Sequence, residues 1–185
     1  MKAGEIVGSF IAKNGFKITL RAPAWSDLDA LLSLINSLVK EGAEISRDAE
    51  ISRDAELEWL AKTLVSVERD EVFFVVAETA GKVVASSSFR VRGGYAKHVA
   101  DLGIVVKKGY RDIGVGTGVM AAIVEQARKM GLEMLALTCF ASNKRAIHVY
   151  EKAGFKQVGI IPKAFLKDDA YVDQIIMVKI LSDNS

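Results

Sequence analysis

The sequence is poor in the residues that hold small secreted domains together or bind metal ions. Its 185 residues include one cysteine, Cys139, and two histidines, His98 and His148. One cysteine cannot form an internal disulfide, and these three residues lack the spacing of a metal site. We therefore expect a protein without a disulfide framework and without a bound metal.

Long apolar runs and a dominant charge are also missing. The apolar run at 72–77 is far shorter than the ~20 residues that cross a bilayer. Glu5 and Lys13 interrupt the apolar region that a secretory signal would need. With 25 basic and 23 acidic residues, the net charge of +2 does not favour nucleic acid. These absences predict one cytoplasmic domain, residues 1–185, with neither a membrane nor a nucleic acid as its partner.

The N-terminal residues predict a β-hairpin followed by a helix. Asn14-Gly15 is a strong turn dipeptide between an apolar segment and the alternating segment 16–20. We interpret residues 1–15 as an extra N-terminal strand. Ser26 is expected to cap a helix with one apolar face that ends at Gly42.

Residues 44–55 contain the hexapeptide Glu-Ile-Ser-Arg-Asp-Ala twice in tandem. Six residues turn a helix through about 600°, so the two copies cannot share one helix face. Two units are also too few for a solenoid. We interpret the repeat as a duplicated insertion in a charged connecting segment, with a second helix beginning near Asp54. Its acidic residues form either a solvated charge run or a cluster that attracts a cationic acceptor.

The rest of the chain alternates between strand and helix patterns. The nearly continuous apolar run at 72–79 indicates an interior strand. Further strands are expected at 82–92, 97–106, 134–140, 155–161 and 171–181, with helices after Gly114 and after Asn143. This order predicts an α/β fold with a mixed, mostly antiparallel sheet, one strand–helix–strand crossover, and helices on both faces.

A glycine-rich loop, Arg111 to Gly118, connects one of these strands to a helix. Unpaired N–H groups and the positive end of the helix dipole attract anions there, and glycines let a phosphate approach the main chain. A Walker-type loop would need Gly-Lys-Ser/Thr, but no lysine precedes Thr117. A dinucleotide loop would need a third glycine where Val119 stands. The loop therefore predicts a phosphate-bearing ligand of another kind.

Two motifs together are more specific than this loop alone. Arg111-x-x-Gly114-x-Gly116 resembles the pyrophosphate loop of the GNAT superfamily of acetyl-CoA-dependent N-acetyltransferases. The segment 143–155, with its asparagine, tyrosine and Gly-Phe, is similar to that family's second signature. The resemblance extends from Phe16 onward, leaving out the first strand and the repeat. It is closest to small-amine and amino-acid acetyltransferases, with similarity to the ribosomal-protein-alanine branch.

The resemblance implies acetyl-CoA (coenzyme A) as cofactor and gives roles to particular residues. In this family the central strand parts from its neighbour, and the gap receives the pantetheine arm. The implied backbone partners of that arm are Ile104, Val105 and Val106. The implied donors to the pyrophosphate are Arg111, Asp112, Ile113, Gly114, Val115, Gly116 and Thr117. Asn143 is expected to hold the arm, and the Asp112 carboxylate to point into solvent, because it would repel phosphate.

By the same resemblance, Tyr150 protonates the thiolate that leaves when an amine attacks the thioester. A phenol of pKa about 10 is protonated at neutral pH and can serve as an acid. A tyrosine at this helical spacing can also be a core aromatic without a catalytic role. The residue that would accept the proton of the attacking amine is not identified by the resemblance. Thr138 stands where the branch that acetylates protein N-termini carries a glutamate, and Asp101 and His98 are the nearest titratable candidates on the preceding strand.

The implied function is transfer of an acetyl group from acetyl-CoA directly to a primary amine of a small molecule, an amino acid or a peptide. The acceptor is expected between the first two helices and the final strands. Since no carboxylate stands at the base position, we expect a weakly basic acceptor, such as an α-amine of pKa about 7.8. Two alternatives are a non-catalytic acyl-CoA-binding sensor and a protein N-terminal acetyltransferase. Homodimers are common in this family, so the resemblance also implies a homodimer.

Overall fold

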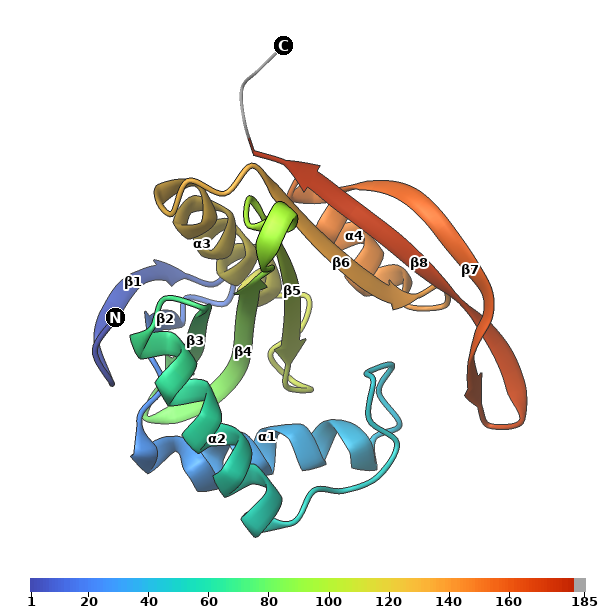
Figure 1. Cartoon of the computed structure of the whole chain (residues 1–185). Coiled ribbons are helices and arrows are strands. Elements are labelled where there is room, and N and C mark those ends of the chain that lie inside the picture. Colours follow the sequence, from blue (N-terminus) through green and yellow to red (C-terminus); the bar gives the residue numbers. More distant parts are fainter. Residues whose placement is uncertain (182–185) are drawn as a thin grey trace.

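A computed structural model of the chain describes residues 1–181 (Figure 1). Its eight strands form one sheet in the order β1-β2-β3-β4-β5-β6-β8-β7. The strands are β1 (Ile6–Ile11), β2 (Lys17–Arg21), β3 (Val72–Thr79), β4 (Lys82–Val91), β5 (Val99–Val106), β6 (Met134–Phe140), β7 (Lys156–Lys167) and β8 (Ala170–Ile180). The helices are α1 (Leu28–Lys40), α2 (Arg53–Glu68), α3 (Val115–Lys129) and α4 (Lys144–Lys152). Within residues 1–181 only β5 and β6 pair in parallel, which confirms the predicted mostly antiparallel α/β sheet.

The sheet is covered by helices on both faces, as predicted. Alternate residues of β3 point in opposite directions, because side chains alternate along a strand. Phe73 and Val75 join a core with α3, whereas Phe74 and Val76 join a second core with α1 and α2. This explains the continuous apolar run, since β3 is buried on both faces. No helix among residues 1–181 has the length and apolar composition needed to span a bilayer.

The N-terminal hairpin forms as predicted and also packs against the glycine loop. Gly15 has a φ of +83°, which the tight turn requires. The backbone N–H of Lys13 donates to the carbonyl of Ile113 at 2.8 Å. On the same side, a Cβ added to Gly118 would lie 2.4 Å from the Phe10 ring. The extra strand is therefore part of the wall beside the glycine loop.

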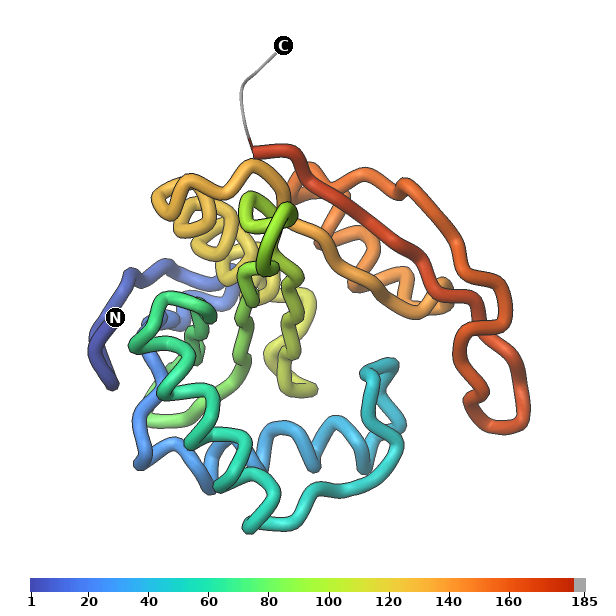
Figure 2. The backbone as a smooth tube through the Cα atoms, in the orientation of Figure 1, coloured from blue at the N-terminus to red at the C-terminus, as the bar shows by residue number. Residues whose placement is uncertain are grey.

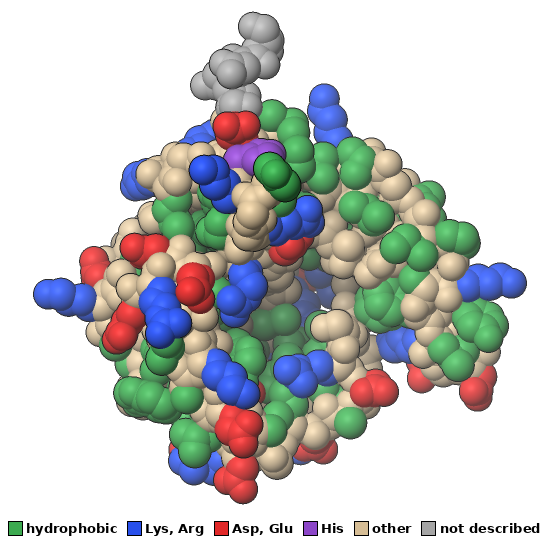
Figure 3. All heavy atoms as spheres, viewed as in Figure 1, with side chains coloured by type: hydrophobic (Ala, Val, Ile, Leu, Met, Phe, Trp, Pro, Cys, Tyr) green, Lys and Arg blue, Asp and Glu red, His purple; other side chains and the backbone are tan. Residues whose placement is uncertain are grey.

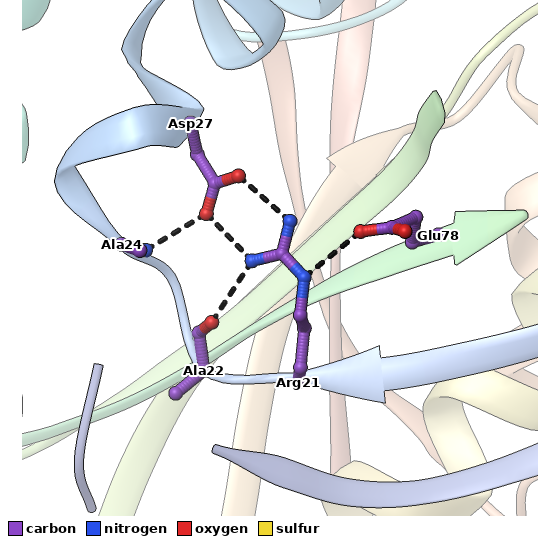
Figure 4. Close-up of polar contacts among 5 residues, drawn as sticks. All are labelled: Arg21, Ala22, Ala24, Asp27 and Glu78. Atoms are coloured by element: carbon purple, nitrogen blue, oxygen red, sulfur yellow. Dashed lines mark hydrogen bonds and ion pairs between the residues drawn. The ribbon is translucent and has the colours of Figure 1, made fainter. Parts of the chain in front are cut away.

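The prediction that Ser26 caps the first helix is wrong. A 3₁₀ turn, Trp25–Asp27, precedes α1, and the buried Asp27 carboxylate accepts a hydrogen bond from the backbone N–H of Ala24 at 2.8 Å. Arg21 donates two hydrogen bonds to this carboxylate, each 2.7 Å long, and one of 2.9 Å to Glu78 (Figure 4). The hydrogen bonds to Asp27 raise the pKa of the Arg21 guanidinium above its ordinary value. This network joins the start of α1 to β2 and β3.

Replacing Asp27 by Ala should lower the free energy of unfolding by about 3 kcal/mol, because a half-buried guanidinium would lose its main partner. Urea unfolding followed by circular dichroism measures this. Asp29→Ala is the matched control two residues further along the chain, since the ion pair of Asp29 with Arg53 is exposed and its loss should change the midpoint little. An equal shift for the two variants would contradict the structural role of Asp27.

The two copies of the hexapeptide adopt different structures. The first copy, residues 44–49, is a loop. In the second copy the Ser52 hydroxyl accepts a hydrogen bond from Ala55 N–H at 3.2 Å and caps α2, so the copy ends inside the first helical turn. The Asn36 side chain of α1 also binds both backbone groups of Ile51. The repeat is therefore not only a connecting segment, because its second half begins the helix.

Strand β7 is longer than predicted, whereas β8 lies within one residue of its predicted bounds. A break was expected after Ile161, where Pro162 stands, but β7 continues to Lys167 across a register shift. Proline is tolerated there because β7 is the edge strand. β7 also exposes apolar side chains, among them Val158 and Ile160. Such an uncovered edge is compatible with self-association, and the homodimer stays a prediction.

Candidate active site

The central parallel strands pair only over a short stretch. β5 and β6 are in register at Val99–Met134, Ala100–Leu135 and Asp101–Ala136, and no further. β5 then stays with β4, and β6 with β8, so the two strands diverge (Figure 2). The edge of β5 that faces β6 has no strand partner from 102 to 106. An extended ligand with amide groups can pair with such an edge.

A cleft of about 1460 Å³ opens at this divergence and is visible as a hollow in the space-filling view (Figure 3). Of the residues predicted for the site, those that line the cleft are Ile104, Val105, Val106, Arg111, Asp112, Gly114, Gly116, Thr117, Asn143 and Tyr150. Ile113 and Val115 do not line it. The Val115 side chain is fully buried in the core, and that of Ile113 packs against the same core. These two residues can therefore contact a ligand only through their backbone groups.

The N-terminus of α3 opens into the cleft without a side-chain cap. Gly114 is the N-cap residue, with a φ of +91°. The first N–H groups of a helix have no partner within the helix. A Cβ at Gly116 would meet Val106 and Val149 only at 3.8 Å, so the glycine leaves room on the cleft side. These groups form a seat for an anion, and the Lys13 side chain lies beside Gly114.

The two charged residues of the loop behave differently. The Arg111 Nε donates to the Val106 carbonyl at 2.9 Å, and its guanidinium pairs with Glu41 at the end of α1. Part of the positive charge expected at the loop is therefore already matched by Glu41. The Asp112 carboxylate is exposed, as expected, and pairs with Arg145 at 3.0 Å.

Tyr150 and Asn143 lie on opposite ends of α4. Tyr150 is 6% exposed, and burial raises the pKa of its phenol, with a smaller effect from Cys139. The phenol is therefore protonated at neutral pH. Asn143 is the N-cap residue, and its Oδ1 accepts from Ala146 N–H at 3.1 Å, which leaves its amide NH₂ for other partners.

The structure corrects the candidate bases. Asp101 and His98 do not line the cleft, and Asp101 instead pairs with Arg92 at 2.8 Å. Thr138 does line it, at the position where the resemblance would place a glutamate. The acidic residues that line the cleft are Glu44, Glu56 and Asp112. Glu44 accepts a hydrogen bond from the Ser142 hydroxyl, which joins the repeat loop to the start of α4.

Glu56 is a cleft residue that the sequence did not single out from its acidic neighbours. It is 5% exposed and sits one turn before Leu60 on the buried face of α2. Burial raises the pKa of its carboxyl above the ordinary value, and the charge of Arg47 partly opposes this. The helical spacing of the apolar residues in α2 could have identified Glu56 from the sequence. An acidic residue stands where the stripe formed by Leu60, Leu64 and Val67 would place an apolar one.

Comparison with known proteins agrees with this geometry. A sequence model of the acetyltransferase (GNAT) family matches residues 33–155. The chain is 34% identical over 84 residues to the L-amino acid N-acetyltransferase AaaT of Escherichia coli (strain K12), which covers 45% of this chain and 52% of that protein. It is 32% identical over 114 residues to an N-alpha-acetyltransferase of Sulfurisphaera tokodaii, covering 55% and 68%. The crystal structure of ribosomal-protein-alanine N-acetyltransferase from Brucella melitensis superposes with a TM-score of 0.78 at 27% identity, covering 88% of this chain and 99% of that one.

Proposed function

Because this chain belongs to the acetyltransferase (GNAT) family, we propose that it acetylates the α-amine of a small molecule, an amino acid or a short peptide. Acetyl-CoA is its cosubstrate, and an amine is its acceptor. The observation that carries the proposal is that three features line one cleft: an unpaired strand edge, an uncapped helix N-terminus and a buried phenol.

The shape of the cleft suits acetyl-CoA. The free edge of β5 at Ile104 can pair with the amides of the pantetheine arm, as an added strand would. The backbone of Val105 faces β4 instead, because the bonds of this segment to β4 fall on alternate residues, such as Val99 and Lys107. The backbone N–H groups of 111–117 can receive the pyrophosphate, with the hydroxyl of Thr117 nearby. Lys13 adds a cation at the same end of the cleft. The carbonyl of Val106 already accepts from Arg111, so the pantetheine contacts are assigned mainly to the backbone of Ile104 and to the N–H of Val106.

Tyr150 is the proposed acid for the leaving thiolate. Attack of the amine on the thioester carbonyl forms a C–N bond and breaks the C–S bond. The sulfur then needs a proton, and a phenol kept neutral by burial can supply it. Asn143 orients the pantetheine arm through its free amide NH₂, while its Oδ1 holds the start of α4. No covalent enzyme intermediate is part of this scheme.

The acceptor is proposed from the chemistry of amines and from the relatives. One relative is named for L-amino acids and another for N-alpha acetylation. An α-amine loses its proton far more readily than a lysine side chain, whose pKa near 10.4 is more than two units higher. Arg47, which lines the cleft, offers a cation to the carboxylate of an amino acid.

At pH 7.5 the kcat/KM for an α-amine should exceed that for a lysine ε-amine by roughly 100-fold, because the unprotonated fraction differs by about that factor. Release of free thiol from acetyl-CoA measures the rate. A short peptide supplies the α-amine, and Nα-acetyl-lysine supplies the ε-amine. The same peptide with a blocked N-terminus is the control. Comparable rates for the two kinds of amine would refute this acceptor class, and cofactor binding without thiol release from any amine would favour a sensor.

A further inference from the structure

Glu56 is a buried carboxylate that the steps proposed above leave without a task. It is 5% exposed and lines the cleft. Burial has the largest effect on the pKa of its carboxyl and raises it, and the charge of Arg47 has a smaller, lowering effect. No hydrogen bond from the described residues contributes. Within residues 1–181 no fully buried side-chain polar atom lacks a partner, so the Glu56 oxygens are in contact with the solvent of the cleft. A buried carboxylate that lacks a partner in the folded chain costs stability, and such groups are kept where they meet a ligand.

The position of Glu56 in α2 is one that packing alone would give to an apolar residue. The buried face of α2 continues from it through Leu60, Leu64 and Val67 into the core shared with α1. Its neighbours on the helix, Leu57 and Trp59, are partly exposed instead. The carboxylate is therefore the point at which the buried stripe of α2 reaches the cleft.

The wall around Glu56 adjoins the open strand. Leu31, Leu34, Phe74, Ser86 and Ser88 line the cleft from α1, β3 and β4, and none carries a charge. Ser86 lies opposite Val105 and Ser88 opposite Gly103 in the β4–β5 ladder, and directly opposed residues share a face of the sheet. Phe74 and the Val105 side chain belong to the core shared by α1 and α2, so Glu56 lies on the side of the sheet to which Val105 of the open strand points.

The one charge that acts measurably on Glu56 among the described residues comes from the repeat loop. Glu44 and Arg47 line the cleft from the first copy of the hexapeptide. Arg47 is the group whose charge acts on Glu56, and no ion pair joins the two among the described residues. The remaining titratable groups of the cleft belong to the hairpin, the glycine loop, β6, α4 and β7. A ligand that carries an ammonium and a carboxylate can pair with Glu56 and Arg47 in this cleft.

We propose that Glu56 binds the ammonium group of the acceptor and accepts its proton before the amine attacks, a role that rests on the proposed acetyl transfer. One proton passes from nitrogen to the Glu56 carboxylate, which later releases it to solvent. The neutral amine then forms the C–N bond as the C–S bond breaks. The thiolate takes a proton from Tyr150, and the second proton lost by nitrogen restores the phenol. Products are an amide, free coenzyme A thiol and one proton.

Glu56→Gln tests this role in the full chain, with the pH profile as the decisive measurement. At pH 7 its kcat/KM should fall about 100-fold, a typical effect of losing a general base. The deficit should shrink at least tenfold above pH 9, where the acceptor amine is already neutral. The dissociation constant for coenzyme A should be unchanged, and Tm should not fall, because the variant removes a buried charge. Glu56→Asp should restore part of the activity.

Glu58→Gln is the matched control on the same helix, since Glu58 is exposed and pairs with Lys62 on the surface of α2. Activity of Glu56→Gln equal to wild type at every pH would overturn the role. So would a loss that is the same at every pH and accompanies a lower Tm, because this indicates a structural effect. Failure of the wild-type protein to acetylate any amine would instead overturn the proposed function and this role with it.

Discussion

Tyr150→Phe is expected to lower kcat by about 100-fold or more while leaving the affinity for coenzyme A within about twofold. The change removes one oxygen from a ring that is otherwise buried beside Phe155. The hydrophobic packing of the ring is kept, so the loss reports on the proton that the phenol supplies. Burial keeps this phenol neutral, and the wild-type rate should therefore not decline at neutral pH through its ionisation. Thiol release measures kcat, and isothermal calorimetry measures the affinity.

The matched control is Tyr171→Phe, because Tyr171 is 65% exposed on β8. It should behave as wild type in both measurements. If Tyr150→Phe kept full turnover, Tyr150 would be a core aromatic and the acid would lie elsewhere. If both the variant and the wild type bound coenzyme A without turnover, the chain would be a sensor of the cofactor.

Gly116→Asp should weaken the affinity for coenzyme A by about 1000-fold. A carboxylate about 4 Å from a phosphate costs roughly 4 kcal/mol at an effective dielectric constant of 20. Every 1.4 kcal/mol is about tenfold in affinity. The side chain would enter the cleft beside Val106 and Val149, at the N-terminus of α3 where the diphosphate is proposed to bind. Calorimetry with coenzyme A at low and at high salt measures the loss and its electrostatic part.

Gly116→Ala separates charge from steric effects. Its added methyl meets neighbours only at 3.8 Å, an ordinary contact distance, so both stability and affinity should change little. Gly118→Ala should behave differently, because its methyl would collide with the ring of Phe10. If Gly116→Asp bound coenzyme A normally and remained folded, the diphosphate would not bind at this helix end.

Local turn and motif chemistry could be read directly from the chain. Asn14-Gly15 produced the hairpin, because a short turn that needs a positive φ at its glycine depends on its own backbone preferences. The helices after Gly114 and after Asn143 began where predicted, because the capping residue of a helix affects only the few residues beside it. The order of strands and helices then resulted from these elements and their apolar periods.

Contacts between distant residues could not be read in this way. Asp27 rather than Ser26 organises the start of α1, because its partner Arg21 is itself held by Glu78, 57 residues further along. Asp101 and His98 were reasonable bases on the predicted strand, yet neither side chain lines the cleft, and His98 lies just before β5 begins. Glu41 neutralises Arg111 across 70 positions of sequence.

The amino-acid sequence by itself determined the types of element, their order and the loop that suits a phosphate, because these depend on turn preferences, helix caps and apolar spacing. Only the tertiary structure decided what the two identical hexapeptides do. One is a loop that places Arg47 in the cleft, and the other caps α2 through Ser52. Their sequences are the same, so the difference comes from the residues that flank each copy. The second copy runs into the stripe that begins with Glu56 and Leu60, and burial of that stripe against α1 stabilises the helix.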